Sequence, residues 1–298
     1  MAQDDPGAET AALLERIRDA RFSNGVRCPR CHGVAIAKWG SFKGRRRYCC
    51  RTCERTFSDL TGTPAVYTKK LSLWGRYARC LADGRSVRSA AGALGIAAST
   101  AFRWRHAIFD ALRAHDRETL SGVVELANLW FAYSRKGERR PEEPGRTRGP
   151  RSRVMFPPRL VVRVIVASDR NGGVVTDVAL TNIVALLDLM DALRSRIAQK
   201  PTLLASQGPL GPVGRLARVL SGEFIDVRGG VAFRPGTLWH LRTNLAYSRR
   251  LLAWIERFRG VATKYLPNYL IWHRIVDAAE RNGPAAVVLR WALRSGFT

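Results

Sequence analysis

Apolar residues at steps of three and four predict helices in the first 120 residues. A first helix is expected over residues 9–21, where the turn-forming sequence Ser23-Asn24-Gly25 follows it. Its apolar positions are Leu13, Leu14 and Ile17. Residues 65–118 also follow a helical pattern, with a stripe formed by Trp74, Tyr77, Ala78 and Leu81. Between these two helical segments lies a compact cysteine-rich block, residues 26–63.

The pattern changes near Gly122, where β-branched residues become frequent. Strands are expected over residues 123–133, 160–168, 174–180, 202–206 and 223–227. Helices are expected over 182–198 and 210–220, and the chain from 244 onward is again helical in pattern. The polar stretch 135–153 holds eight basic residues, three Glu, three Pro and three Gly, so it is a loop or a flexible arm.

The charge of the chain favours a polyanionic partner. Lysine and arginine number 50 against 24 acidic residues, a formal net charge of +26. Such a surface attracts nucleic acid and gains affinity from counterion release. The alternative is an arginine-rich composition inherited from a GC-rich genome. The longest apolar stretches, 160–167 and 285–293, are too short to span a bilayer, and the acidic start lacks the features of a signal peptide. We therefore expect a cytoplasmic, nucleoid-associated bacterial protein with reduced thiols.

Two CxxC pairs predict a zinc site. The four cysteines are Cys28, Cys31, Cys50 and Cys53. Four thiolates at this spacing can close a tetrahedron around Zn²⁺, and four sulfurs leave no position for water, so the zinc is expected to be structural. We interpret Cys49, Cys80 and His32 as bystanders, although Cys49 is an alternative to Cys50.

The segment between the two CxxC pairs predicts a basic hairpin. Residues 39–48 are expected to form its strands, with Gly44 at the turn. Its charges are Lys43, Arg45, Arg46 and Arg47. These side chains would contact phosphates, which gives affinity without sequence readout. A solvated charged hairpin is the alternative.

Residues 86–106 predict a helix-turn-helix. Ala90, Ala91 and Leu94 would pack the first helix, Gly95 would make the turn, and Ala101, Trp104 and Ile108 would anchor the second helix. The outer face would then present Ala98, Ser99, Phe102 and Arg103 to DNA. Arg103 is suited to read guanine and Phe102 to touch a thymine methyl group. Ala97 is a weak N-cap, and an ordinary helical hairpin is the alternative.

Several motifs together point to one family. The most specific is Trp239-His240-Leu241-Arg242-Thr243-Asn244, followed by Tyr247-Ser248, Trp254 and the run 258–270. Shorter matches are Arg47-Tyr48, Phe57, Thr61-Gly62-Thr63 and Ser134-Arg135-Lys136-Gly137. From about Phe22 to Asp277 the chain resembles the zinc-ribbon, DDE-type insertion-sequence transposases. The resemblance implies an RNase H-like domain with a mixed five-stranded sheet, binding to double-stranded element ends, and a homo-oligomer.

The resemblance also exposes a defect in the expected active site. The family's first strand reads Val-Glu-Leu-Asp-Glu, whereas residues 124–128 place Ala127 at the Asp position. The family's Thr-Asp-Gly becomes Ser-Gln-Gly, with Gln207 at the second Asp position, and Asn244 fits the third. Two Mg²⁺ ions normally perform the chemistry and prefer carboxylate oxygens. Mg²⁺ is therefore expected for the family but not for this chain.

Other polar residues are candidates for a role near this site. Glu125 lies on the strand face of Ala127, about 7 Å away, but the family already has a Glu there. Asp169 is expected to be a solvated residue at a hairpin tip, and Asp226 is a second possible substitute. His240 would orient a phosphate or pack beside Trp239. Expected DNA-backbone contacts are Arg135, Lys136, Arg242 and Lys264, and each is otherwise a solvated side chain. The aromatic residues of 254–272 are expected to form core.

The chain is therefore predicted to be a multidomain α+β protein. Its parts are an N-terminal helix (1–25), a zinc ribbon (26–63), a helix-turn-helix region (64–118), an RNase H-like α/β domain of the catalytic type (119–280) and a C-terminal helix (281–298). The preferred function is a transposase-family protein that binds DNA and has lost cleavage. The alternatives are an active transposase with a non-standard metal site and a zinc-ribbon factor that binds protein subunits.

Overall fold

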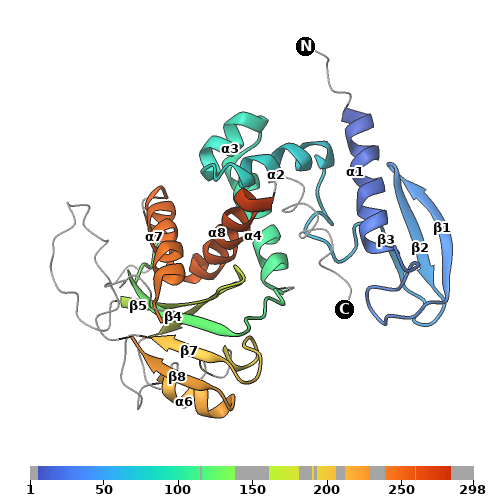
Figure 1. Ribbon diagram of the computed structural model, residues 1–298. Coiled ribbons are helices and arrows are strands. Elements are labelled where there is room, and N and C mark those ends of the chain that lie inside the picture. The colour runs from blue at the N-terminus through green and yellow to red at the C-terminus, as the bar shows by residue number, and fades with distance from the viewer. Residues whose placement is uncertain are drawn as a thin grey trace. The chain divides into compact units, whose positions relative to one another are not determined.

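The computed structural model describes residues 6–114, 116–137, 161–180, 190, 193–205, 212–227, 239–258 and 260–282 (Figure 1). The chain divides into two compact units. The first comprises residues 1–116 and 274–298, and the second comprises residues 117–273.

The first unit begins with a helix and a small antiparallel sheet. Helix α1 spans Pro6–Arg21, three residues longer at its start than the sequence pattern indicates. The sheet has the order β1-β2-β3, with β1 at Ile36–Phe42, β2 at Arg45–Cys50 and β3 at Thr56–Ser58. The rings of Tyr48 and Phe57 stack 5.2 Å apart, and Phe22 meets Tyr48 edge-on at 5.8 Å. These rings form the small core beneath the hairpin.

A buried carboxylate joins α1 to this sheet. Asp59 is fully buried, and its Oδ2 accepts hydrogen bonds from Arg18 Nε at 3.1 Å, Arg18 Nη2 at 3.0 Å and the Arg46 N–H at 2.8 Å. Its Oδ1 accepts from the Tyr48 hydroxyl at 3.1 Å. Arg21 donates to the Asp59 and Thr61 carbonyls. Since the carboxylate has this many donors, its burial is compensated, and α1 is anchored to the sheet.

The rest of the first unit is helical. A 3-10 turn at Leu71–Leu73 leads into α2 (Trp74–Ala82), followed by α3 (Val87–Leu94) and α4 (Ala98–Ala114). Trp104 of α4 packs against Trp74 and Tyr77 of α2, with ring centroids 5.5 and 5.4 Å apart. Each of these three side chains is buried, so they form the core of the helical part.

The second unit contains a mixed five-stranded sheet, as predicted. Its strands are β4 (Val123–Ala132), β5 (Val161–Asp169), β6 (Val174–Leu180), β7 (Thr202–Ala205) and β8 (Glu223–Asp226), in the order β6-β5-β4-β7-β8. Strands β4, β5 and β6 pair antiparallel, whereas β7 runs parallel to both β4 and β8. Together with the cysteine-bearing sheet, this gives the α+β class and the kind of sheet implied by the RNase H-like resemblance.

Helices cover both faces of this sheet (Figure 1). One face is apolar, and Val124, Leu126 and Leu203 pack there with α6 (Pro212–Val219). The opposite face carries Glu125 and receives α7 (Arg242–Glu256). A 3-10 turn at Thr263–Tyr265 then leads into α8 (Leu266–Asn282). Because side chains alternate along β4, neighbouring residues meet different helices.

The aromatic residues of α7 and α8 form core, as expected. Trp254 packs against Trp272 with centroids 4.6 Å apart, and Phe258 against Tyr269 at 5.0 Å. Trp254, Tyr269 and Trp272 are buried. Among the described residues, no helix is both long and apolar enough to cross a membrane.

Several predictions fall outside the described residues. These are Gln207, the arm from 138 to 153, most of the helix expected over 182–198, and the C-terminal helix beyond 282.

Candidate functional site

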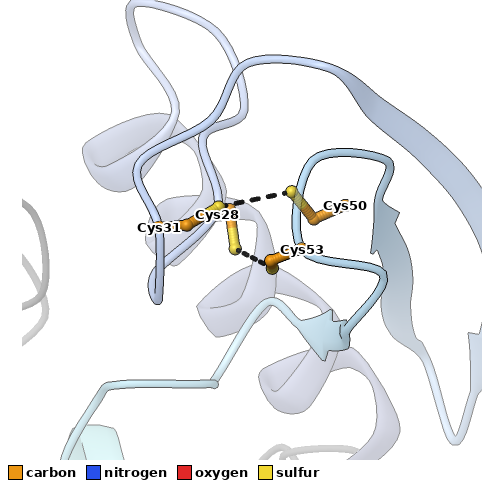
Figure 2. A group of neighbouring side chains, drawn as sticks. All are labelled: Cys28, Cys31, Cys50 and Cys53. Carbon is orange, nitrogen blue, oxygen red and sulfur yellow. Dashed lines mark hydrogen bonds between the residues drawn. The ribbon is translucent and has the colours of Figure 1, made fainter.

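Four cysteine sulfurs converge at one end of the small sheet, as the two CxxC pairs predict (Figure 2). The Sγ atoms of Cys28 and Cys53 lie 3.7 Å apart, those of Cys31 and Cys50 lie 3.6 Å apart, and all four lie within 4.8 Å of one another. A tetrahedral ion with sulfurs at about 2.3 Å requires sulfur–sulfur distances of about 3.8 Å. The cluster therefore fits a structural metal such as zinc.

Two thiols of the cluster have pKa values that are shifted in opposite directions. Burial would raise the pKa of Cys50, but the N–H groups of Cys53 and Thr52 and the neighbouring thiols lower it to about 6. An N–H group of Gly33 favours the Cys31 thiolate, yet burial and the other thiols raise the pKa of Cys31 to about 12. The thiols thus compete for negative charge, and a divalent cation would relieve that competition.

The cysteines interpreted as bystanders lie outside this cluster. Cys80 is buried in α2. Cys49 lies on the opposite strand face from Cys50, and its Sγ approaches the Cys50 carbonyl at 4.0 Å. The described metal-binding group includes neither residue, nor His32.

Helices α3 and α4 pack against one another through a tight turn. The Ser86 hydroxyl caps α3 by accepting from the Ser89 N–H, and Gly95 ends it with φ +61°. No side chain of Ala97 can cap α4, and only its carbonyl accepts from the first turn. The residues expected to form the inner faces are all buried: Ala90, Ala91, Leu94, Ala101, Trp104 and Ile108. Helices α3 and α4 therefore form a closely packed helical hairpin, which is compatible with both interpretations of this segment.

The outer face of α4 is exposed where DNA contacts are expected. Ser99, Phe102 and Arg103 are each exposed. The Phe102 ring lies 4.3 Å from that of His106, one turn further along. Burial lowers the pKa of His106, the charge of Arg105 lowers it further, and Asp110 partly opposes this. The imidazole next to this surface therefore resists protonation.

Glu125 is the buried carboxylate of the β4 face that meets α7. Its Oε2 accepts the N–H of Asn244 at 2.9 Å, in the first turn of α7. Its Oε1 lies 3.7 Å from both Arg170 Nε and His240 Nδ1 and accepts no hydrogen bond from the described residues. The Arg170 guanidinium and the N-terminus of α7 thus lie beside this anion, and they oppose a cation at the same place.

Asn244 is occupied by structural hydrogen bonds. Its Nδ2 donates to the carbonyls of Glu125 at 2.9 Å and Val166 at 2.8 Å, and its Oδ1 accepts from Ser248 Oγ at 3.2 Å. The residue is fully buried. Its amide consequently fastens α7 to β4 and β5.

Among the described residues, the other candidate positions place no second carboxylate beside Glu125. Ala127, which pairs with Val166 on the same face, has no ligand atom in its side chain. Asp226 pairs with Ala205 of the apolar core, so it lies on the opposite face of the sheet from Glu125. Asp169 is buried, and the prediction of a solvated residue is wrong: its carboxylate accepts the N–H groups of Ser121, Asn171 and Gly173. It holds the β5–β6 turn together.

The basic residues expected to contact DNA are mostly at the surface. Six of them are exposed: Arg46, Arg47, Arg135, Lys136, Arg242 and Lys264. Arg45 is half-buried and donates to the Thr68 carbonyl at 2.7 Å. Lys136 donates weakly to the Gly260 carbonyl at 3.4 Å. Sequence reasoning missed Arg170, whose only signal was its position next to the turn residue Asp169.

Comparison with known proteins gives one similar relative. No protein-family model matches the chain. It is 29% identical over 273 residues to a Halobacterium salinarum protein called "Uncharacterized protein in transposable element ISH50", covering 87% of both chains. That relative is archaeal, so it does not support the expected bacterial origin.

Two solved structures give weaker similarities. The pre-cleavage Mos1 transpososome matches at 12% identity and a TM-score of 0.26, over 75% of this chain and 79% of that chain. The Mos1 transposase paired-end complex with left transposon end matches at 14% identity and a TM-score of 0.25, over 70% and 76%. At these TM-scores the two similarities carry no argument about this chain.

Proposed function

We propose that this chain is a transposase-related DNA-binding protein of a transposable element that no longer cuts DNA. The relative belongs to a transposable element by its name, and it aligns along nearly the whole length of both chains. The observation that carries the loss of cleavage is the environment of Glu125, whose buried carboxylate lies beside the Arg170 guanidinium and accepts the Asn244 N–H.

The described residues of this face do not fit paired Mg²⁺ ions. Mg²⁺ needs several oxygen ligands and keeps its water tightly. Ala127 supplies none, the Asn244 Oδ1 already accepts from Ser248, and Glu125 faces Arg170 and His240. A dication placed there would meet at least one fixed positive charge and lose the attraction that assembles a two-metal site.

The four-cysteine cluster is proposed to hold Zn²⁺ in a structural role. The sulfur distances match a closed tetrahedral site, and Zn²⁺ bound in this way would stabilise the fold of the ribbon. Cys28, Cys31, Cys50 and Cys53 would all be ligands, so none is left for catalysis.

Helix α4 is proposed to read duplex DNA at the ends of the element. Its exposed residues Ser99, Phe102 and Arg103 follow the tight turn at Gly95, where a recognition helix presents its first turns to the major groove. The exposed basic residues of both units would contact phosphates. Binding as a homo-oligomer to paired ends is part of the same proposal.

The DNA-binding part is tested by fluorescence anisotropy with duplexes selected from a random pool. Affinity should fall steeply between about 50 and 200 mM salt, because each neutralised phosphate adds about 0.9 to the slope of log K against log salt. Arg103→Ala should cost about 1–3 kcal/mol on selected duplexes and much less on random ones. Arg88→Ala, an exposed change on α3, is the matched control and should weaken both kinds of DNA equally. Binding that ignores salt would instead favour a protein partner.

The loss of cleavage is tested with a supercoiled plasmid that carries the selected DNA. The zinc-loaded protein should give no nicked or joined product with Mg²⁺ or Mn²⁺. Nicking that needs one of these ions and that coelutes with the protein would contradict the proposal. It would support an active transposase with a non-standard metal site.

A further inference from the structure

The outer face of the β1–β2 hairpin carries two exposed aromatic rings. Tyr48 points to the buried side of β2, so Arg45 and Arg47, at odd positions of the same strand, point to the other side. Phe42 pairs directly with Arg45 and therefore shares this outer face. Trp39 follows Lys38, the partner of Tyr48, and so lies on the outer face as well, within the irregularity between Lys38 and Ser41.

These two rings are largely open to solvent. Trp39 is 56% exposed and Phe42 is 62% exposed, although both belong to one seven-residue strand. Large aromatic side chains in a small sheet usually supply its core. Here the core is made by Tyr48 and Phe57 on the opposite side. The outer rings are consequently surplus to the folding of the ribbon.

Positive side chains share the hairpin with the rings, and Arg45 and Arg47 share their face. No acidic residue occurs between Asp19 and Glu54, and the segment 38–47 contains Lys38, Lys43, Arg45, Arg46 and Arg47. The Lys43 ammonium lies 5.5 Å from the centroid of the Phe42 ring, at the hairpin turn. Flat aromatic faces beside cations are complementary to bases linked by phosphates.

We propose that this outer face, Trp39 and Phe42 with Lys43 and Arg47, binds single-stranded DNA by stacking on unpaired bases. The inference deepens the proposed DNA-binding function and rests on it. In a duplex the base faces are covered by their neighbours, so exposed rings find stacking partners only where bases are unpaired. The same unit would then contain a duplex-reading helix, α4, and a separate platform for unpaired nucleotides. Unpaired nucleotides are also what opened or frayed element ends would offer.

The experiment compares the affinity of the full-length, zinc-loaded protein for two probes. One is a labelled oligothymidylate of about twelve nucleotides, within the size that such surfaces bind. The other is a duplex selected as above. The variants are Trp39→Phe, Trp39→Leu and Phe42→Ala, and Tyr67→Ala is the matched control because Tyr67 is 92% exposed in the same unit. Zinc content and thermal unfolding are measured for each variant to confirm an intact fold.

Trp39→Leu and Phe42→Ala should each weaken oligothymidylate binding by about 5- to 150-fold, the value of one stacked base. Their duplex affinity should change less than about twofold, and Tyr67→Ala should change neither. Trp39→Phe should retain most of the affinity, because a ring remains. These results would support the inference even if the wild-type protein bound no duplex, an outcome that would defeat only the proposed function.

Three results would overturn the inference. One is a wild-type protein that does not bind oligothymidylate. Another is an equal loss on both probes, which would assign the rings to duplex binding. The third is an equal loss for Trp39→Phe and Trp39→Leu, which would show that the rings act without stacking. Selective duplex binding with ring-independent oligothymidylate binding would leave the proposed function intact and refute the platform.

Discussion

Replacing Glu125 by Gln tests whether this carboxylate fastens α7 or serves a metal. The change keeps the shape and one acceptor oxygen for the Asn244 N–H but removes the charge. Two unit charges 3.7 Å apart attract by about 4.5 kcal/mol at an effective dielectric constant near 20. Most of this attraction offsets the desolvation of Glu125, and His240 contributes only when it is protonated. With the weakened charge-assisted hydrogen bond, we expect a net loss of about 2–3 kcal/mol.

Such a loss should lower the melting temperature of the second unit by roughly 5–10 °C. Calorimetry with and without Mg²⁺ measures it, and Glu223→Gln, at the exposed first residue of β8, is the matched control, with little expected effect. Mg²⁺ should not raise the melting temperature of the wild-type protein. The reasoning is refuted if Mg²⁺ stabilises the wild-type protein and Glu125→Gln abolishes that shift without other destabilisation, because a ligand that binds only the folded state stabilises it.

Further outcomes follow for the first unit. Asp59→Asn should destabilise it by about 3 kcal/mol because Arg18 would lose its buried partner, whereas the exposed control Asp19→Asn should be nearly neutral in thermal unfolding. Removing the metal with a chelator should unfold the ribbon, and an unchanged near-ultraviolet dichroism spectrum would exclude a structural ion. Burial lowers the pKa of His106 in the folded state. The free energy of unfolding should therefore be unaffected by this group above its unfolded pKa of about 6.5 and should decrease as the pH drops below that value. His106→Gln should flatten that fall in pH-dependent denaturation, and an unaltered slope would assign it to other groups.

Most helices and strands could be predicted from the sequence because the apolar pattern within each segment indicates which of its side chains are buried. Strands β4 and β5, predicted from their β-branched residues, lie within one residue of their predicted bounds, and the predicted helical region 65–118 contains α2, α3 and α4. The metal cluster was equally predictable from the sequence, since CxxC spacing alone brings two sulfurs together. Helix α1 was predicted three residues short because Pro6, suited to a first helical turn, carries no apolar signal.

The surroundings of Glu125 and Asn244 could not be predicted from the sequence, because they depend on residues far apart in the chain. The Asn244 amide bonds the carbonyls of Glu125 and Val166, 119 and 78 positions away. Such contacts depend on strand register and helix docking, which no short motif encodes. Asp169 was misassigned for a related reason: a turn aspartate is solvated or buried according to what its neighbours donate, here three N–H groups.

The link between α1 and Asp59 also constrains the order of events during synthesis. Arg18 leaves the ribosome 41 residues before its carboxylate partner. At about 5–20 residues per second, the helix waits roughly 2–8 s for the residue that anchors it. During that interval Leu14 and Ile17, which are buried in the folded protein, remain uncovered. At this helix the nascent chain is therefore vulnerable to aggregation and proteolysis until Asp59, which follows the second cysteine pair, has emerged.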